Sequence, residues 1–522
     1  MKRIVSYSAF VVLLFCGWAA RSVAQEAPKE APSAEARTTE TKAPTTAAEP
    51  KEESSVTDHT IRVGGQTIPY KATASMTLLK NDKDEPTALI YSTAYTRSDV
   101  KDVSQRPIAF LYNGGPGSAS LWLHMGAFGP RRVVTDNAAA TPPAPYKLVD
   151  NESSLLDKAD LVFIDPVGTG FSHAVGKAQD KDFWGVDQDV KSLAQFISIY
   201  VNRNNRWNSP KFLIGESYGT FRSVALGEYL ESNENMSVNG IVLISSVLDL
   251  GTLSFTAGDD QPYIFYLPTY AAVAWYYNIL KDRPDDLSAF LSEARQFAST
   301  EYAAALMKGS KLTAAETADM AKKLTRFTGL SEDYLIKANL RVTLSQFRAE
   351  VERNRGITIG RYDARYPGPT YDLLTERAEY DPSFSAVAGA FTAAFNSYVR
   401  ADLKFGGDKD YKVLPDGPGE AWDWKHGGRG GFPGAPSVEG DLIRAMTEDA
   451  HLQVQVENGY FDMATPFFAT EYTMDHLLLP ESGRSRIHLQ YYNAGHMMYL
   501  HEEDLAKLKA NVGSFIDSAW KP

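Results

Sequence analysis

The chain has 522 residues, of which 43% are hydrophobic and 11% aromatic, and its formal net charge is -12. This composition is ample for a large buried core. The negative charge argues against nucleic acid as a partner.

Residues 1–24 have the composition of a cleavable secretory signal: a basic start, an apolar run, and small residues from Ser22 to Ala24 before the cleavage point. The apolar run is too short to span a bilayer comfortably, which disfavours the alternative of an uncleaved anchor. The only cysteine, Cys16, falls inside this segment, so we expect no disulfide in the mature chain. We predict a secreted or periplasmic protein with no membrane span after signal removal.

Residues 25–57 consist mainly of Ala, Pro, Glu, Thr, Lys and Ser and contain no aromatic residue. Such a segment cannot bury enough apolar surface to offset the entropy lost on ordering, so we predict a disordered low-complexity linker. From residue 58 to residue 522 the pattern is that of a globular domain.

Short apolar runs rich in Val, Ile, Phe and Tyr recur along this domain. Runs of this length are typical of buried strands in a mostly parallel sheet. Polar amphipathic stretches at 186–202 and 221–232 separate several of them. The alternation predicts an α/β fold with helices on both sides of the sheet. The apolar runs are 107–112, 161–164, 211–214, 240–245, 452–456 and 487–492.

Residues 215–219 read Gly-Glu-Ser-Tyr-Gly and lie between the apolar run 211–214 and a predicted helix. A serine in a tight turn between strand and helix has strained backbone geometry and exposes its hydroxyl above the sheet edge. The flanking glycines relieve crowding around it. We therefore predict Ser217 as the nucleophile of a serine hydrolase, the alternative being an ordinary turn serine.

Residues 252–395 have a different, mainly helical texture. Thr313-Ala-Ala-Glu316 is a capping-box pattern, and residues 331–355 show helical spacing. We predict a helical cap inserted over the active site, the alternative being helices that pack elsewhere on the sheet.

A serine hydroxyl needs a hydrogen-bonded base to act as a nucleophile. His496 follows the last apolar run, 487–492, on a loop beside a glycine, and Asp462 follows the preceding run on another loop. A carboxylate there is suited to fix the histidine tautomer and stabilise the imidazolium. The rival acid is Glu457, which we expect to be structural. The order Ser217, Asp462, His496 is that of α/β-hydrolases.

Five stretches together resemble the signatures of the serine carboxypeptidase family, and they occur in the family's order. The resemblance identifies a divergent member, which we expect to be bacterial, and implies an α/β-hydrolase fold with a catalytic domain over 58–522. The stretches are 110–120 (Phe-Leu-Tyr-Asn-Gly-Gly-Pro-Gly-Ser-Ala-Ser), 164–172 (Ile-Asp-Pro-Val-Gly-Thr-Gly-Phe-Ser), 215–219, 458–462 and 494–496.

The resemblance also implies roles for single residues. The backbone N–H groups of Gly115 and Tyr218 match the family's oxyanion hole, whose donors meet charge that develops in the transition state. Asn113 and Glu216 match the positions that bind the substrate's terminal carboxylate. A protonated glutamic acid donates a hydrogen bond to a carboxylate whereas an ionised one repels it, so we expect tight binding to favour acidic pH.

Two positions depart from the family pattern. Leu111 stands where family carboxypeptidases commonly have Trp, and Ala127 stands where they have Glu. The leading prediction is a serine-type carboxypeptidase that hydrolyses C-terminal peptide bonds through an acyl-enzyme. The alternative is an esterase or acyltransferase that uses the same triad on a small acyl substrate. A third hypothesis, a non-catalytic scaffold, is disfavoured by the intact motifs.

We expect no metal and no cofactor. The sequence has no H-E-x-x-H motif, and the glycine-rich stretch 113–117 lacks the lysine of a phosphate-binding loop. The expected partner is a peptide or a small acyl substrate.

Overall fold

The computed structural model describes residues 50–427 and 435–521. The predicted signal, 1–24, and the first part of the predicted linker, 25–49, lie outside this range. The end of the predicted linker needs correction, because strand β1 (Ser54–Val63) already begins at Ser54 and pairs with β2 (Gln66–Lys80) along its whole length. Among the described helices, none is long and apolar enough to cross a membrane.

One sheet of 10 strands organises the domain, in the order β1-β2-β3-β7-β4-β9-β10-β13-β14 with β8 paired to β3. All neighbours from β7 to β14 are parallel, whereas β1, β2, β3 and β7 pair antiparallel. This mostly parallel sheet, flanked by helices, confirms the predicted fold class. The remaining strands are β3 (Pro86–Arg97), β4 (Ile108–Tyr112), β7 (Asp160–Ile164), β8 (His173–Ala174), β9 (Lys211–Glu216), β10 (Gly240–Ile244), β13 (Gln453–Gly459) and β14 (Ile487–Tyr492).

The central strands are continuous apolar runs because both faces of the sheet are covered. Every residue of β4, β7, β9 and β10 is buried, as expected for parallel strands between two helical layers. The predicted runs match these strands closely, and the run 487–492 has the same bounds as β14.

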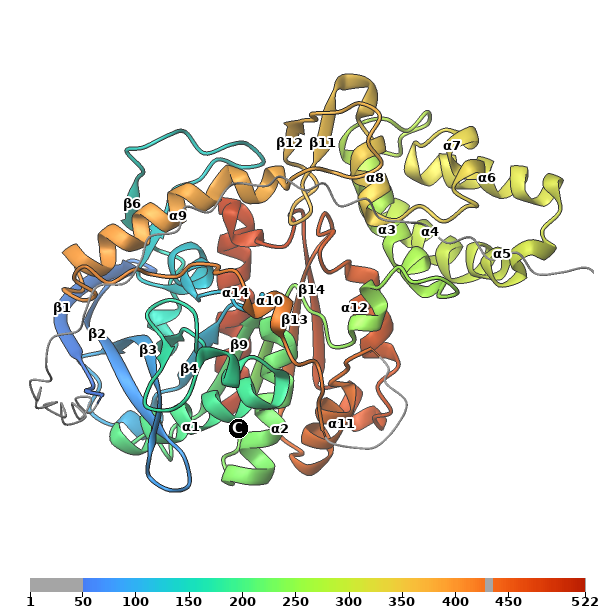
Figure 1. Ribbon diagram of the computed structural model, residues 1–522. Helices are drawn as coiled ribbons and strands as arrows, with labels where there is room; N and C mark the ends of the chain where they lie inside the picture. Colours follow the sequence, from blue (N-terminus) through green and yellow to red (C-terminus); the bar gives the residue numbers. More distant parts are fainter. Residues whose placement is uncertain (1–49, 428–434, 522) are drawn as a thin grey trace, which may run out of the picture. The chain divides into compact units, whose positions relative to one another are not determined.

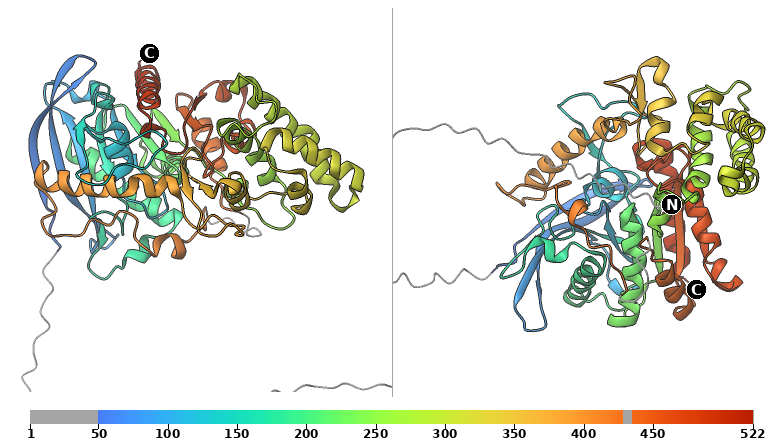
Figure 2. Two further views of the ribbon diagram at one scale, coloured as in Figure 1. Left: turned by 90° about the horizontal axis from the view of Figure 1, so that it is seen from above. Right: turned by 45° about the vertical axis from the view of Figure 1, so that its right-hand side comes forward.

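Helices cover both faces (Figures 1 and 2). Helices α1 (Val186–Arg203), α2 (Tyr218–Glu234) and α11 (Glu439–Glu448) share one apolar core with the sheet. Helices α9 (Pro382–Ala401) and α14 (Glu502–Trp520) contribute to a second core. The sheet therefore lies between two apolar layers.

A third apolar core is formed mainly by the helices between β10 and β11, drawn in yellow and light green in Figure 1, and also includes Phe461, Met463 and Phe467 after β13. The helices are α3 (Gln261–Tyr276), α4 (Leu287–Phe297), α5 (Ala303–Lys308), α6 (Ala314–Thr328), α7 (Glu332–Lys337) and α8 (Leu344–Glu350). α9 begins inside the predicted insertion 252–395, yet its apolar side chains join the core that α14 shares with the sheet. The separate helical core is accordingly shorter than the predicted insertion.

Two local predictions in this region have different outcomes. The capping box is present at the start of α6, where Thr313 and Glu316 satisfy each other's backbone N–H groups. The stretch 331–355, by contrast, is not one helix, because Asn339 and Leu340 have positive φ angles of 51° and 63° and separate α7 from α8. The remaining strands and α-helices of the described residues are β5 (Arg131–Val133), β6 (Leu148–Asp150), β11 (Ile357–Ile359), β12 (Pro367–Pro369), α10 (Pro418–Ala421), α12 (Phe467–Asp475) and α13 (Glu481–Arg484).

Candidate active site

The loops that follow β4, β9 and β14 meet at one pocket, since the carboxyl ends of parallel strands share one edge of the sheet. Its polar lining includes Asn113, Gly115, Glu216, Ser217 and His496. Within residues 50–427 and 435–521, no group of three or more His, Cys, Asp and Glu side chains is arranged to hold a metal ion. The apolar lining of the pocket consists of Trp122, Phe384, Leu414 and Met497, with the ring of Tyr362.

Ser217 occupies the sharp turn between β9 and α2. Its backbone angles, φ 59° and ψ −130°, lie in a region that non-glycine residues rarely adopt and that costs about 1–3 kcal/mol. The turn is so tight that a Cβ atom on Gly215 would lie 2.0 Å from the carbonyl oxygen of Gly219. The glycines predicted to relieve crowding are therefore required for Ser217 to reach the pocket.

His496 and Asp462 form a buried hydrogen-bonded pair. Nδ1 of His496 lies 2.7 Å from Oδ2 of Asp462, and the two residues are 2% and 0% exposed. Asp462 is itself held, because its Oδ1 accepts hydrogen bonds from the backbone N–H groups of Ala464 and Thr465. Burial alone lowers the pKa of His496, but the charge of Asp462 outweighs it and the pKa is raised.

The remaining nitrogen of the imidazole is available to the pocket. Nε2 of His496 is buried and has no hydrogen-bond partner among the described residues, and no bond joins it to Ser217. Catalytic hydrogen bonds are often long in free enzymes and shorten when substrate binds. The structure thus brings the three predicted triad residues to one site. The hydrogen bond between His496 and Asp462 is formed, and the one between Ser217 and His496 is not.

Glu457, the rival acid, has no contact with His496 among the described hydrogen bonds. It is fully buried and accepts hydrogen bonds from Tyr492 (2.7 Å) and from Gln455 (2.5 Å). Burial raises the pKa of Glu457 to about 7. Its contacts are those of a structural residue.

The loop that carries His496 is fixed by a segment that the sequence analysis did not single out. The backbone N–H of His496 donates to the carbonyl of Tyr362 (2.6 Å), and the two rings lie 5.1 Å apart. A Cβ atom on Gly495 would lie 2.3 Å from the same carbonyl. The N–H of Gly495 donates to Asp363. In the sequence, Gly495 is the one residue that indicates this close approach of the two backbone segments.

The two predicted oxyanion donors lie at adjoining backbone segments. The N–H of Tyr218 is in the first turn of α2, where backbone donors have no partner within the helix. Gly114 approaches it so closely that a Cβ atom there would lie 2.4 Å from the nitrogen of Tyr218. Gly115 follows with a φ of 103° and lines the pocket. This arrangement suits an oxyanion hole.

A fully buried arginine on α2 connects these segments, and sequence reasoning missed it. Arg222 donates from Nε to Asp189 and from Nη1 to the carbonyl of Asn113, each at 2.6 Å. Its guanidinium also lies over the rings of Tyr112 and Tyr218, at 5.3 Å and 5.2 Å. The side chain therefore ties the loop after β4 to the helix after Ser217.

Asn113 and Glu216 lie side by side at the pocket. The Asn113 oxygen accepts from the backbone N–H of Leu123 (3.0 Å), while its Nδ2 has no partner among the described residues. Burial raises the pKa of Glu216 to about 7, although His496 and the nearby polar side chains lower it in part. Leu111 and Ala127, the two departures from the family pattern, are both 0% exposed in the apolar core and contribute no polar side chain.

Another stretch covers the ring of Tyr218. Trp422 lies edge-on to that ring, with centroids 5.4 Å apart. Four residues later, His426 contacts Asp187 through Nδ1 and Asp441 through Nε2, both at 2.7 Å. The hydrogen bond with Asp441 is the main reason why the pKa of His426 is raised.

A family profile described as "Serine carboxypeptidase" matches residues 64–256. The matched region includes the loop after β4 and the nucleophile turn. It ends before Asp462 and His496, so those two residues are supported by geometry and by the sequence motifs.

Curated relatives match over a similar part of the chain. The pheromone-processing carboxypeptidase KEX1 of Saccharomyces cerevisiae is 30% identical over 182 residues, which cover 33% of this chain and 23% of that protein. Serine carboxypeptidase-like 45 of Arabidopsis thaliana is 27% identical over 179 residues, which cover 33% of this chain and 36% of that protein. The matched stretch is therefore a minor part of each relative's length.

A solved structure extends the likeness to most of the chain. The crystal structure of Kex1(Δ)p, a prohormone-processing carboxypeptidase from Saccharomyces cerevisiae, superimposes with a TM-score of 0.54 at 17% identity. The superposition covers 86% of this chain and 91% of that one. At this identity the likeness establishes a shared fold.

Proposed function

The chain belongs to the serine carboxypeptidase family, and on that premise we propose that it hydrolyses the C-terminal peptide bond of a peptide through an acyl-enzyme on Ser217. The observation that carries the proposal is the pocket itself. It combines Ser217 and the buried His496–Asp462 pair with the Asn113 amide and the Glu216 carboxyl.

In the proposed first step, Nε2 of His496 takes the proton of Ser217 as the hydroxyl oxygen attacks the substrate carbonyl. The charge on Asp462 stabilises the imidazolium that forms. The N–H groups of Gly115 and Tyr218 donate to the developing oxyanion. The imidazolium then gives its proton to the leaving amine as the C–N bond breaks.

The leaving group in this proposal is an amino acid with a free carboxylate, and Glu216 recognises it. A buried carboxyl whose pKa is about 7 is protonated at acidic pH and donates a hydrogen bond to that carboxylate. Above pH 7 the Glu216 carboxyl ionises and repels the substrate carboxylate.

In the second step, water attacks the acyl-enzyme while His496 serves as the base, and Ser217 is released.

The test compares an N-blocked dipeptide that has a free C-terminus with its C-terminal amide, from about pH 5 to about pH 8. The free acid is expected to have the higher kcat/KM at acidic pH, and the advantage should shrink as the pH rises through about 7. Ser217→Ala is the control for contaminating activity. Equal turnover of both substrates at every pH would overturn the proposed carboxylate recognition.

An esterase or acyltransferase is the second candidate, and the apolar side chains of Leu111 and Ala127 favour it. These two positions supply no polar group to a carboxylate network. An enzyme of this kind would use the same serine, histidine and oxyanion donors on a small acyl ester. Rapid turnover of such an ester with no discrimination between dipeptide acid and amide would identify it.

A further inference from the structure

Three buried polar atoms beside the nucleophile have no hydrogen-bond partner among the described residues: Nδ2 of Asn113, Oε2 of Glu216 and the hydroxyl of Tyr499. Buried polar groups in folded proteins are nearly always paired, so a cluster of unpaired ones needs an explanation. Where unpaired atoms of this kind border a pocket, a ligand bound in the pocket can supply their missing hydrogen-bond partners. Asn113 and Glu216 line this pocket.

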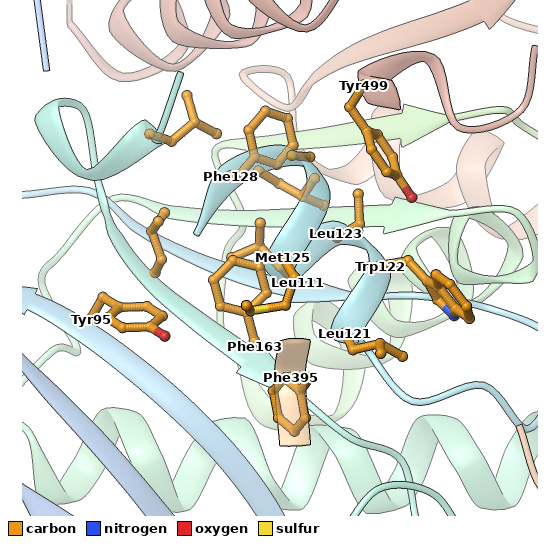
Figure 3. Packing of buried hydrophobic residues seen from close by; sticks show 14 of the residues in the cluster. Tyr95, Leu111, Leu121, Trp122, Leu123, Met125, Phe128, Phe163, Phe395 and Tyr499 are labelled. Atoms are coloured by element: carbon orange, nitrogen blue, oxygen red, sulfur yellow. The ribbon is translucent and has the colours of Figure 1, made fainter. Parts of the chain in front are cut away.

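Tyr499 is the member of this cluster that no sequence motif indicated. It is 3% exposed and lies three residues after His496, in a 3-10 turn. Figure 3 shows its ring beside the segment that carries Leu123 and Met125. A Cβ atom on Gly126 would lie 2.6 Å from this ring, so the glycine leaves the space that the tyrosine fills.

The unpaired hydroxyl of Tyr499 lies near the unpaired carboxyl oxygen of Glu216. Tyr499 and Asn113 are close enough to Glu216 to lower its pKa, against the larger effect of burial, yet neither completes a hydrogen bond to Oε2. Burial, together with the Glu216 charge, raises the pKa of Tyr499 well above its ordinary value, so the phenol remains a donor. The titratable and polar groups that face Glu216 are His496, Asp462, Tyr499, Tyr362 and Asn113.

We propose that Tyr499 is a specificity-determining positioning residue: its hydroxyl, which is unpaired among the described residues, donates a hydrogen bond to the Glu216 carboxyl when a substrate is bound. That bond directs the proton of Glu216 toward the terminal carboxylate of the substrate. The inference rests on the proposed carboxypeptidase function. Tyr499 fills the space beside Gly126. The next residue, Ala127, stands at the position where the family pattern has a glutamate. The substrate class is thus a peptide with a free C-terminal carboxylate, recognised jointly by Asn113, Glu216 and Tyr499.

The test is Tyr499→Phe, which removes one oxygen and keeps the ring against Gly126. KM for the free-acid dipeptide is expected to rise about tenfold, with kcat and the turnover of the amide changed less than about twofold. Because the hydroxyl lowers the pKa of Glu216, its loss should move the midpoint of the pH profile for the free acid upward from about 7. A purely structural residue would affect acid and amide equally and leave the midpoint in place.

Tyr302→Phe is the matched control, since Tyr302 is also buried but its hydroxyl donates to Leu340 in the separate helical core. It should leave the ratio of acid to amide turnover unchanged. If Tyr499→Phe does not fold, Tyr499→Met, which also lacks the hydroxyl and keeps an apolar side chain, is judged by the same criteria.

The outcomes separate this inference from the function on which it rests. Wild-type protein that does not distinguish acid from amide overturns the proposed function. If wild-type protein distinguishes acid from amide and the Tyr499 variant keeps the same discrimination and the same pH midpoint, only the role of Tyr499 is overturned. A selective rise in KM for the acid together with the upward midpoint supports both.

Discussion

Replacing Arg222 tests how the loop after β4 is fixed to the nucleophile helix. In Arg222→Met the buried carboxylate of Asp189 loses the one ion-pair partner that it has in the described part of the chain, and the carbonyl of Asn113 loses a donor. Both Arg222 and Asp189 are nearly inaccessible, with side chains 0% and 2% exposed. Removing one partner of such a pair typically costs about 3–5 kcal/mol, because the other charge stays buried and uncompensated.

The assay is urea unfolding of the full chain, with the free energy of unfolding taken from each transition. The matched control is the double variant Arg222→Met/Asp189→Leu, which leaves no charge unpaired and should be less destabilised than the single variant. The released Asn113 loop should also lower kcat/KM by about tenfold, less than the loss of an oxyanion donor itself. A single variant destabilised by less than about 1 kcal/mol, or a double variant less stable than the single one, would refute the reasoning.

Three further outcomes follow from the same geometry. Gly114→Ala forces a Cβ atom against the backbone nitrogen of Tyr218, so activity should fall by at least about a hundredfold in a folded protein, and retention of full activity would contradict the proposed oxyanion hole. Asp462→Asn should lower kcat by about 10⁴-fold because the amide no longer stabilises the imidazolium of His496; a loss below about tenfold would refute that role. The pKa of His426 is raised by its carboxylate partners, so its stabilising contribution is complete below its ordinary pKa of 6.5 and is lost as the pH rises through the raised value. Wild type should therefore exceed His426→Gln in melting temperature at about pH 6 and lose that margin by about pH 9, and a margin that grows with pH would contradict this.

The strands and the nucleophile turn are predictable because their causes are local. Parallel strands buried on both faces are continuous apolar runs, so β9 and β14 are visible in the sequence. The turn at Ser217 is visible because only glycine tolerates the close backbone contacts on either side of it. The break between α7 and α8 was missed, since Asn339 and Leu340 adopt positive φ angles that the helical spacing of their neighbours conceals.

The supporting residues of the site were not predictable, because each acts across a long separation in the chain. Arg222 binds the carbonyl of Asn113, 109 residues away. The carbonyl of Tyr362, which follows β11, accepts a hydrogen bond from the backbone N–H of His496. The ring of Tyr499 fits into the core only because Gly126 leaves room for it. Such contacts depend on packing, and no local pattern of residue types marks them.

The most direct test of the central claim is labelling of the full chain with a fluorophosphonate probe, followed by mass spectrometry of the modified peptide. Wild-type protein should be labelled at Ser217, and Ser217→Ala should not be labelled. His496→Ala should react far more slowly, because the hydroxyl then has no base. Unchanged labelling of Ser217→Ala, or rapid labelling of His496→Ala, would contradict a nucleophile at Ser217 activated by His496.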